Sequence, residues 1–333
     1  MVEKFRNPAS AGSHGVATRK TPPRSRWKAA LNYIRNYWLV LLLAGPGLIA
    51  LLLFTYMPLF GSVIAFEDYS PVTLFLSPWV GLRNFGMLTT SAIFGRLVFN
   101  TLFLNVLFIS AETIMGLVLA LLLNELRVKF FKRLSQSLMF LPYFIGWPVV
   151  GVMLLSFIDY DMGIFNNVLA SMGVDKIAFT NTPDIWPWLL TLIRIWKNAG
   201  AQCIIYLASL SAIDPQLYEA AAIDGASRIQ RMLRISLPLL IGIIILMILL
   251  SIGRIFYGDV GMIYALIRDY AELYPTTDVI DTYLLRALRV NSNYGFSAAV
   301  GLIQSAVSLV LVLGSNWLAR RYSARQNEDY ALF

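Results

Sequence analysis

The sequence predicts an all-α membrane protein with six transmembrane helices and both termini in the cytoplasm. Of its 333 residues, 58% are hydrophobic and only 14% are charged, whereas about a quarter of the residues of an ordinary soluble domain are charged. Apolar runs of the length that spans a bilayer as a helix, about 20 residues, recur along the chain. Lys and Arg gather in alternate connecting segments, as the positive-inside rule expects.

Prolines are expected to bend or break two of the expected spans. Pro46 and Pro58 are expected to bend or end the first span, and Pro142 and Pro148 to break the third, because proline lacks the N–H that a helix needs. A short helix at the membrane surface is expected over 84–96. The six expected spans are 38–66, 97–123, 137–158, 186–211, 237–257 and 297–319.

The distribution of basic residues sets the orientation. With the N-terminus inside, the cytoplasmic segments carry 18 of the 27 Lys and Arg residues and the external segments carry 6, so both termini are assigned to the cytoplasm. The chain then consists of a basic cytoplasmic tail, a transmembrane domain and a second cytoplasmic tail. Their bounds are 1–36, 37–319 and 320–333; the external segments are 67–96, 159–185 and 258–296.

Composition excludes several classes of function. The chain has one cysteine, Cys203, and one histidine, His14, so an intramolecular disulfide, a His-based metal site and a Ser-His-Asp triad are all excluded. We predict no catalytic residue and no metal site. The net charge of +8 suggests nucleic acid, but the basic residues lie mainly between apolar spans, where they set orientation instead.

The connection between the fourth and fifth spans, 212–238, has a distinctive local pattern. Asp214 is a good N-cap, residues 219–222 favour a helix, and Gly225 can end that helix in a left-handed turn. A second, basic helix is expected to follow until Pro238 opens the fifth span. Local physics alone leaves two interpretations open: a surface loop that only joins two spans, or a small helix-turn-helix against which a partner packs.

This connection resembles the EAA loop of permeases in binding-protein-dependent ABC importers. The resemblance rests on Glu219-Ala220-Ala221, Asp224-Gly225-Ala226 and Leu237-Pro238 at the family's spacing. Outside the loop, the segments 79–85 and 294–299 resemble the sugar-permease branch. Segment 274–283 resembles oligosaccharide and polysaccharide permeases, among them the larger permease subunit of alginate importers.

The resemblance implies a transport permease of the bacterial cytoplasmic (inner) membrane. Its loop would dock on an ATPase subunit through Glu219, Ala220, Ala221, Asp224 and Gly225, with Leu237-Pro238 marking the start of the fifth span. The implied partners are a second, different permease chain, two ATPase subunits, an extracytoplasmic solute-binding protein, an oligosaccharide and the lipid bilayer. The chain has no G-x-x-x-x-G-K-[ST] loop, so ATP and Mg²⁺ are expected on the ATPase partners and no cofactor on this chain.

Three ionisable residues fall within predicted spans: Glu112, Arg194 and Lys197. From the helical rise, Glu112 and Lys197 lie at depths where they could meet. They could form an ion pair between helices without touching substrate. Alternatively, Arg194 or Lys197 lines the pathway while Trp196 stacks on a sugar face. Two cations against one carboxylate would leave a positive surplus, which would favour an acidic oligosaccharide such as alginate.

Two other classes of protein remain as alternatives. An ion-coupled secondary sugar transporter would share the spans and the intramembrane charges but would work without ATP. A membrane-embedded enzyme, such as a glycosyl-transfer protein, would need catalytic carboxylates in a cytoplasmic loop. No such carboxylate set is found in the predicted cytoplasmic loops.

Overall fold

A computed structural model describes residues 35–72, 77–89, 92–126 and 128–326. Within these ranges the chain is helical and contains no strand, only one isolated β-bridge between Glu67 and Trp79. The predicted tail 1–36 lies almost entirely outside the described residues. The chain divides into two units, the first ending at Gly61 and the second comprising Ser62–Phe333.

In the first unit, helix passes through both prolines. Pro46 lies inside α2 (Trp38–Leu51), and Pro58 lies in α3 (Met57–Phe60), directly after a π turn at Leu52–Tyr56. A π turn widens the helix locally, which lets the chain accommodate a residue without an N–H. Neither proline therefore ends the helix, which was one of the outcomes expected from the sequence.

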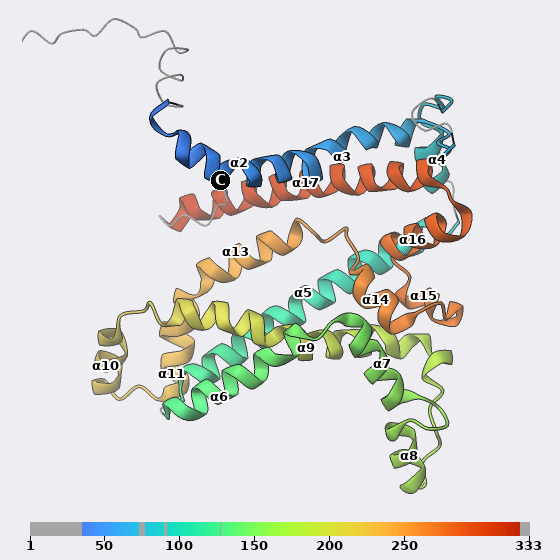
Figure 1. The fold of residues 1–333 in the computed structure, drawn as a ribbon. Coiled ribbons are helices and arrows are strands. Elements are labelled where there is room, and N and C mark those ends of the chain that lie inside the picture. The colour runs from blue at the N-terminus through green and yellow to red at the C-terminus, as the bar shows by residue number, and fades with distance from the viewer. Residues whose placement is uncertain (1–34, 73–76, 90–91, 127, 327–333) are drawn as a thin grey trace, which may run out of the picture. The chain divides into compact units, whose positions relative to one another are not determined.

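Helices α5 (Phe94–Asn124) and α9 (Trp186–Leu210) pack along each other at the centre of the second unit (Figure 1). Between them in sequence lie α6 (Lys129–Phe140), a 3₁₀ turn (Leu141–Phe144) and α7 (Trp147–Ile158). The direction changes by 97° before α7. The expected break in the third span is thus confirmed.

The helix that enters the fifth predicted span does not begin at Leu237-Pro238. It comprises α11 (Arg228–Arg231), a π turn (Met232–Ser236) and α12 (Leu237–Leu239), and passes through Pro238. The chain bends by 55° before α13 (Ile241–Ile252). Because the π turn accommodates Pro238, helix continues through Leu237-Pro238 and the bend follows at Leu240. The start of the fifth span stays a prediction.

The remaining helices frame this centre. Of the helix expected over 84–96, the structure has α4 (Arg83–Thr89). Residues from Phe94 on belong to α5, which starts three residues before the predicted span. The last helix, α17 (Tyr294–Gln326), extends into the tail predicted over 320–333, whose end from 327 on lies outside the described residues. The others are α8 (Ile164–Ser171), α10 (Pro215–Ile223), α14 (Val260–Ile267), α15 (Tyr274–Thr277) and α16 (Ile280–Asn291).

Among the described residues, three helices are long and apolar enough to cross a membrane, or up to five if each bent pair forms one span. The three are Trp38–Phe66, Phe94–Asn124 and Tyr294–Arg321. Helix α9 has 25 residues but is not among them; its polar Arg194, Lys197 and Asn198 lower its apolarity. The count of six spans and the cytoplasmic termini stay predictions.

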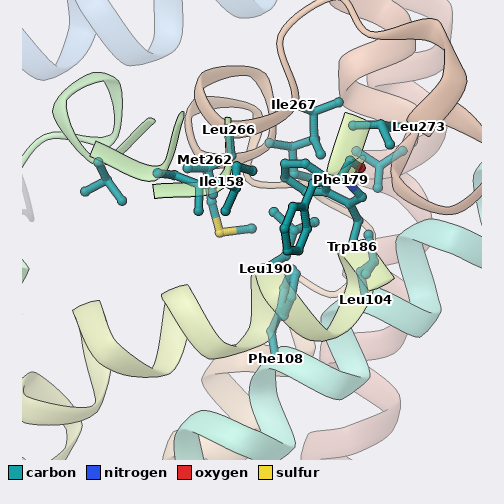
Figure 2. Close-up of a cluster of buried hydrophobic side chains, with 14 residues drawn as sticks. Leu104, Phe108, Ile158, Phe179, Trp186, Leu190, Met262, Leu266, Ile267 and Leu273 are labelled. Atoms are coloured by element: carbon teal, nitrogen blue, oxygen red, sulfur yellow. Dashed lines mark hydrogen bonds between the residues drawn. The ribbon is translucent and has the colours of Figure 1, made fainter. Parts of the chain in front are cut away.

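A buried hydrophobic cluster joins the central pair, α5 and α9, to α7 and α14. Leu104 and Phe108 of α5 meet Trp186 and Leu190 of α9, and α7 and α14 contribute Ile158, Met262, Leu266 and Ile267 (Figure 2). The Trp186 indole N–H donates to the Phe179 carbonyl oxygen at 2.8 Å, so this large ring is buried with its polar atom satisfied. The cluster fixes α14 against α5 and α9.

Candidate functional site

A polar cleft of about 410 Å³ opens between α5, α9 and the segment that joins α13 to α14. Four of the residues around it are ionisable, which is unusual for a chain of this composition and points to an aqueous or ligand-filled space. The lining residues are Asn105, Ile109, Glu112, Arg194, Ser251, Arg254, Tyr257, Gly258, Asp259 and Val260.

Arg194 is the centre of an ion-pair network in this cleft. Its Nε donates to Oε1 of the buried Glu112 at 2.8 Å, and its Nη1 donates to Oδ2 of Asp259 at 3.3 Å. Asn198 donates a second hydrogen bond to Glu112 Oε1 at 2.7 Å. The Phe108 ring lies 4.8 Å from the Arg194 guanidinium, so the cation is also stabilised by an aromatic face.

The predicted meeting of Glu112 with Lys197 was wrong. Glu112 pairs with Arg194 instead, while the Lys197 ammonium donates to the carbonyl oxygens of Tyr143 at 2.7 Å and Pro142 at 3.4 Å. Depth along the two helices could not separate these outcomes, since Arg194 and Lys197 are less than one turn apart. The direction in which each side chain leaves α9 decides the partner.

Lys197 caps the break in the third predicted span. Ile145 and Gly146 are extended, so the Tyr143 carbonyl lacks the helical N–H four residues on. The Lys197 ammonium satisfies it and lies 5.4 Å from the Tyr143 ring and 5.1 Å from the Trp147 ring, on the two sides of the break. This buried cation thus neutralises the carbonyl end of the broken helix.

The positive surplus predicted from Arg194, Lys197 and Glu112 was counted on a different set of residues from the one that lines the cleft. Lys197 does not line the cleft, and Asp259 contributes a second carboxylate to it. Two arginines face two carboxylates. Trp196 does not line the cleft either: it is 45% exposed and lies about 200° around α9 from Arg194.

Sequence reasoning missed five polar cleft residues, Asn105, Ser251, Arg254, Tyr257 and Asp259. Asn105 could have been found, because it precedes Glu112 by two turns and lies on the same face of α5. Asp259, Tyr257 and Arg254 could not, since the segment after α13 was assigned to the span edge and an external loop. Asp259 also caps α14, its Oδ1 accepting from the Met262 N–H at 3.0 Å, so one carboxylate serves both the helix and the ion pair.

The loop between α9 and α11 has the expected local structure. The Asp214 side chain caps α10 by accepting from the Gln216 N–H at 2.9 Å, and Gly225 ends the turn with φ +78°. Ser227 and Gln230 then form a capping box for α11. Glu219, Ala220 and Asp224 are exposed, and the apolar Ile223 is 87% exposed.

Comparison with known proteins shows the family to which this chain belongs. A family model described as "Binding-protein-dependent transport system inner membrane component" matches residues 112–324, which include the whole loop and most of the cleft. The chain belongs to this family. Members of the family are transport permease subunits, which are not themselves catalytic.

The permease has curated and structural relatives over most of its length. It is 37% identical to the polygalacturonan/rhamnogalacturonan transport system permease protein YteP of Bacillus subtilis (strain 168), covering 89% of this chain and 92% of the relative. A crystal structure of a bacterial ABC transporter involved in the import of the acidic polysaccharide alginate contains a chain with TM-score 0.81 and 32% identity, covering 88% of this chain and 99% of that chain.

A second structure of the alginate transporter, in complex with an alginate pentasaccharide-bound periplasmic protein, gives TM-score 0.80 and 32% identity, covering 90% of this chain and 99% of that chain. The permease therefore has the ABC permease fold. The resemblance inferred from the loop motif and the sugar-permease segments is confirmed.

Proposed function

We propose that this chain is one permease subunit of an ATP-driven, binding-protein-dependent importer that carries oligosaccharides across the bacterial cytoplasmic membrane. The observation that carries the proposal is the agreement in fold with an alginate-importer chain over 99% of that chain's length. The permease has six spans and both termini in the cytoplasm. A second permease chain and two ATPase subunits complete the transporter.

The cleft supports the choice of an oligosaccharide as substrate. Carbohydrates are bound by convergent polar side chains and aromatic rings, and the cleft offers Asn105, Ser251 and Tyr257 beside its ion pairs. The relatives' names point to polysaccharides that contain uronates, galacturonan and alginate. We assign the cleft to the translocation pathway, with Glu112 and Arg194 in its wall.

The loop supports coupling to an ATPase. Ile223, which is 87% exposed at the end of α10, offers an apolar contact to a partner, and Glu219 and Asp224 beside it supply charges for orientation. Docking of Glu219–Gly225 in a groove of the ATPase would transmit closure of two ATPases to α9 and α11, which flank α10. The ATPase would hold ATP and Mg²⁺; this chain would need neither.

Substitutions at Gly225 test the coupling. Because its φ is +78°, Gly225→Pro is incompatible with the turn, and Glu219→Lys inverts the docking charge. Both should abolish ATP-driven uptake and substrate-stimulated ATP hydrolysis in proteoliposomes, while the binding protein keeps its affinity for sugar. Gly225→Asn is the matched control, since asparagine tolerates the left-handed conformation, and should retain most of the activity.

The same proteoliposomes separate the proposed importer from an ion-coupled transporter. Uptake should persist with an ionophore as long as ATP is supplied, and should stop when ATP is removed. Uptake that collapses with the ionophore while ATP persists would overturn the proposal, as would full transport by an assembled Gly225→Pro complex.

A further inference from the structure

One cation of the cleft, Arg254, forms no ion pair, because Arg194 binds both of the cleft's carboxylates. Arg194 uses two of its guanidinium nitrogens on Glu112 and Asp259. Glu112 is also bound by Asn198, and Asp259 by the Met262 N–H. Arg254, the fourth ionisable residue of the lining, is exposed and has no ion pair or side-chain hydrogen bond to any residue that the structure describes.

The backbone that carries Arg254 is held firmly although its side chain is free. The Tyr257 carbonyl accepts from Asn105 Nδ2 of α5 at 3.2 Å, and the Phe256 carbonyl accepts from Gln304 Nε2 of α17 at 2.9 Å. The Gly258 N–H donates to Asp281 Oδ2 of α16 at 2.6 Å. Three helices thus position the turn that follows Arg254, which lowers the entropy cost of binding a ligand there.

We infer that Arg254 is the residue that recognises a carboxylate of the oligosaccharide in the cleft. A guanidinium binds a carboxylate through two parallel hydrogen bonds, and this charged pairing is stronger and more specific in geometry than a neutral hydrogen bond. Binding at Arg254 leaves the Arg194 network intact, so the substrate need not break a buried ion pair to enter. The substrate class that follows is a uronate-containing oligosaccharide.

The hydrogen-bonding groups near Arg254 also suit a uronate. Asn105 Nδ2 is occupied by the Thr101 and Tyr257 carbonyls, which leaves its Oδ1 to accept from a sugar hydroxyl. The Tyr257 hydroxyl, paired with Ser305 at 3.0 Å, places an aromatic ring at the edge of the cleft. Arg254 thus supplies specificity for the carboxylate, and its neutral neighbours contact the rest of the sugar.

This inference rests on the proposed function, and the experiment separates the two. The complete transporter with its binding protein is reconstituted in proteoliposomes. ATP-driven uptake is measured for an oligogalacturonate and for its carboxyl-reduced derivative of equal length, in which each carboxylate is a neutral hydroxymethyl group. The variants are Arg254→Gln, Arg254→Lys and, as matched control, Arg96→Gln, which removes an exposed arginine of α5 that does not line the cleft.

Arg254→Gln should reduce uptake of the oligogalacturonate relative to the reduced sugar by about tenfold, the scale of a lost charged hydrogen bond. Arg254→Lys should give an uptake ratio between those of the wild type and Arg254→Gln, because lysine keeps the charge but loses the bidentate geometry. Arg96→Gln should leave the ratio unchanged. Equal losses for both sugars, or none, would overturn the role of Arg254. Wild-type transporter that takes up neither sugar would overturn the oligosaccharide assignment and the inference with it.

Discussion

The Lys197 ammonium donates a 2.7 Å hydrogen bond to the carbonyl oxygen of Tyr143, at the point where a predicted span breaks and turns by 97°. A buried lysine and an orphaned carbonyl are each costly alone, and here each satisfies the other. The sequence left two roles open for Lys197, an ion pair between helices or a substrate contact. In the structure, Lys197 binds the carbonyl end of a broken helix.

Lys197→Met should destabilise the permease. The apolar replacement keeps the length of the side chain but leaves the Tyr143 carbonyl unsatisfied, at a cost of about 1–3 kcal/mol. The measurement is the thermal unfolding midpoint of the purified complex, which should fall. Lys176→Met is the matched control: Lys176 donates to the Asp161 carbonyl at 3.3 Å in an exposed place, where water can replace it, so its midpoint should hardly change.

Gly200→Ala should also lower the midpoint. A Cβ built at Gly200 would lie 2.0 Å from the Met139 carbonyl oxygen of α6, so α6 and α9 would have to separate. Overpacking of this kind costs about 1–3 kcal/mol. Gly314→Ala on α17 is the comparison, because nothing lies within 4 Å of its added Cβ; it should be neutral or slightly stabilising. Equal effects of the two changes would contradict the close packing of α6 on α9.

The Glu112–Arg194 pair should show strong coupling in a double-mutant cycle. Arg194→Gln leaves the Glu112 and Asp259 carboxylates without their common cation, so it should lower the free energy of unfolding by about 3–5 kcal/mol. Glu112→Gln should lower it by less. The double variant should lose less than the sum of the two singles, since no lone charge remains at Glu112. Unfolding free energies that simply add would show that the pair is not formed.

Reporter fusions test the proposed topology. Fusions after residues 130 and 225 and at the C-terminus should report cytoplasm, and those near 75, 172 and 275 should report the outside, because the basic segments stay on the cytoplasmic side. This measurement is decisive for the two bent helix pairs. Each pair either crosses the membrane as a broken span or enters it and returns to the side from which it came. An external C-terminus would show that the number of spans is odd.

The sequence by itself determined the class of the protein, the break in its third predicted span and the local structure of its loop. Apolar runs of bilayer length, the helix break at Pro142–Pro148 and the left-handed turn at Gly225 depend on contacts only a few residues apart. Such local features follow from backbone geometry and are visible in sequence order. The capping of α10 by Asp214 belongs with them.

Only the tertiary structure decided which charges meet. Arg194 and Lys197 are three residues apart on one helix, yet one pairs with Glu112 and Asp259 while the other caps Tyr143. Their roles differ because α5 and α14 pack against one face of α9, and α6 against another, and these packings join residues dozens of positions apart. Hydropathy records that a charge is in the membrane; its partner is fixed by the direction in which the side chain leaves the helix and by what the fold places there.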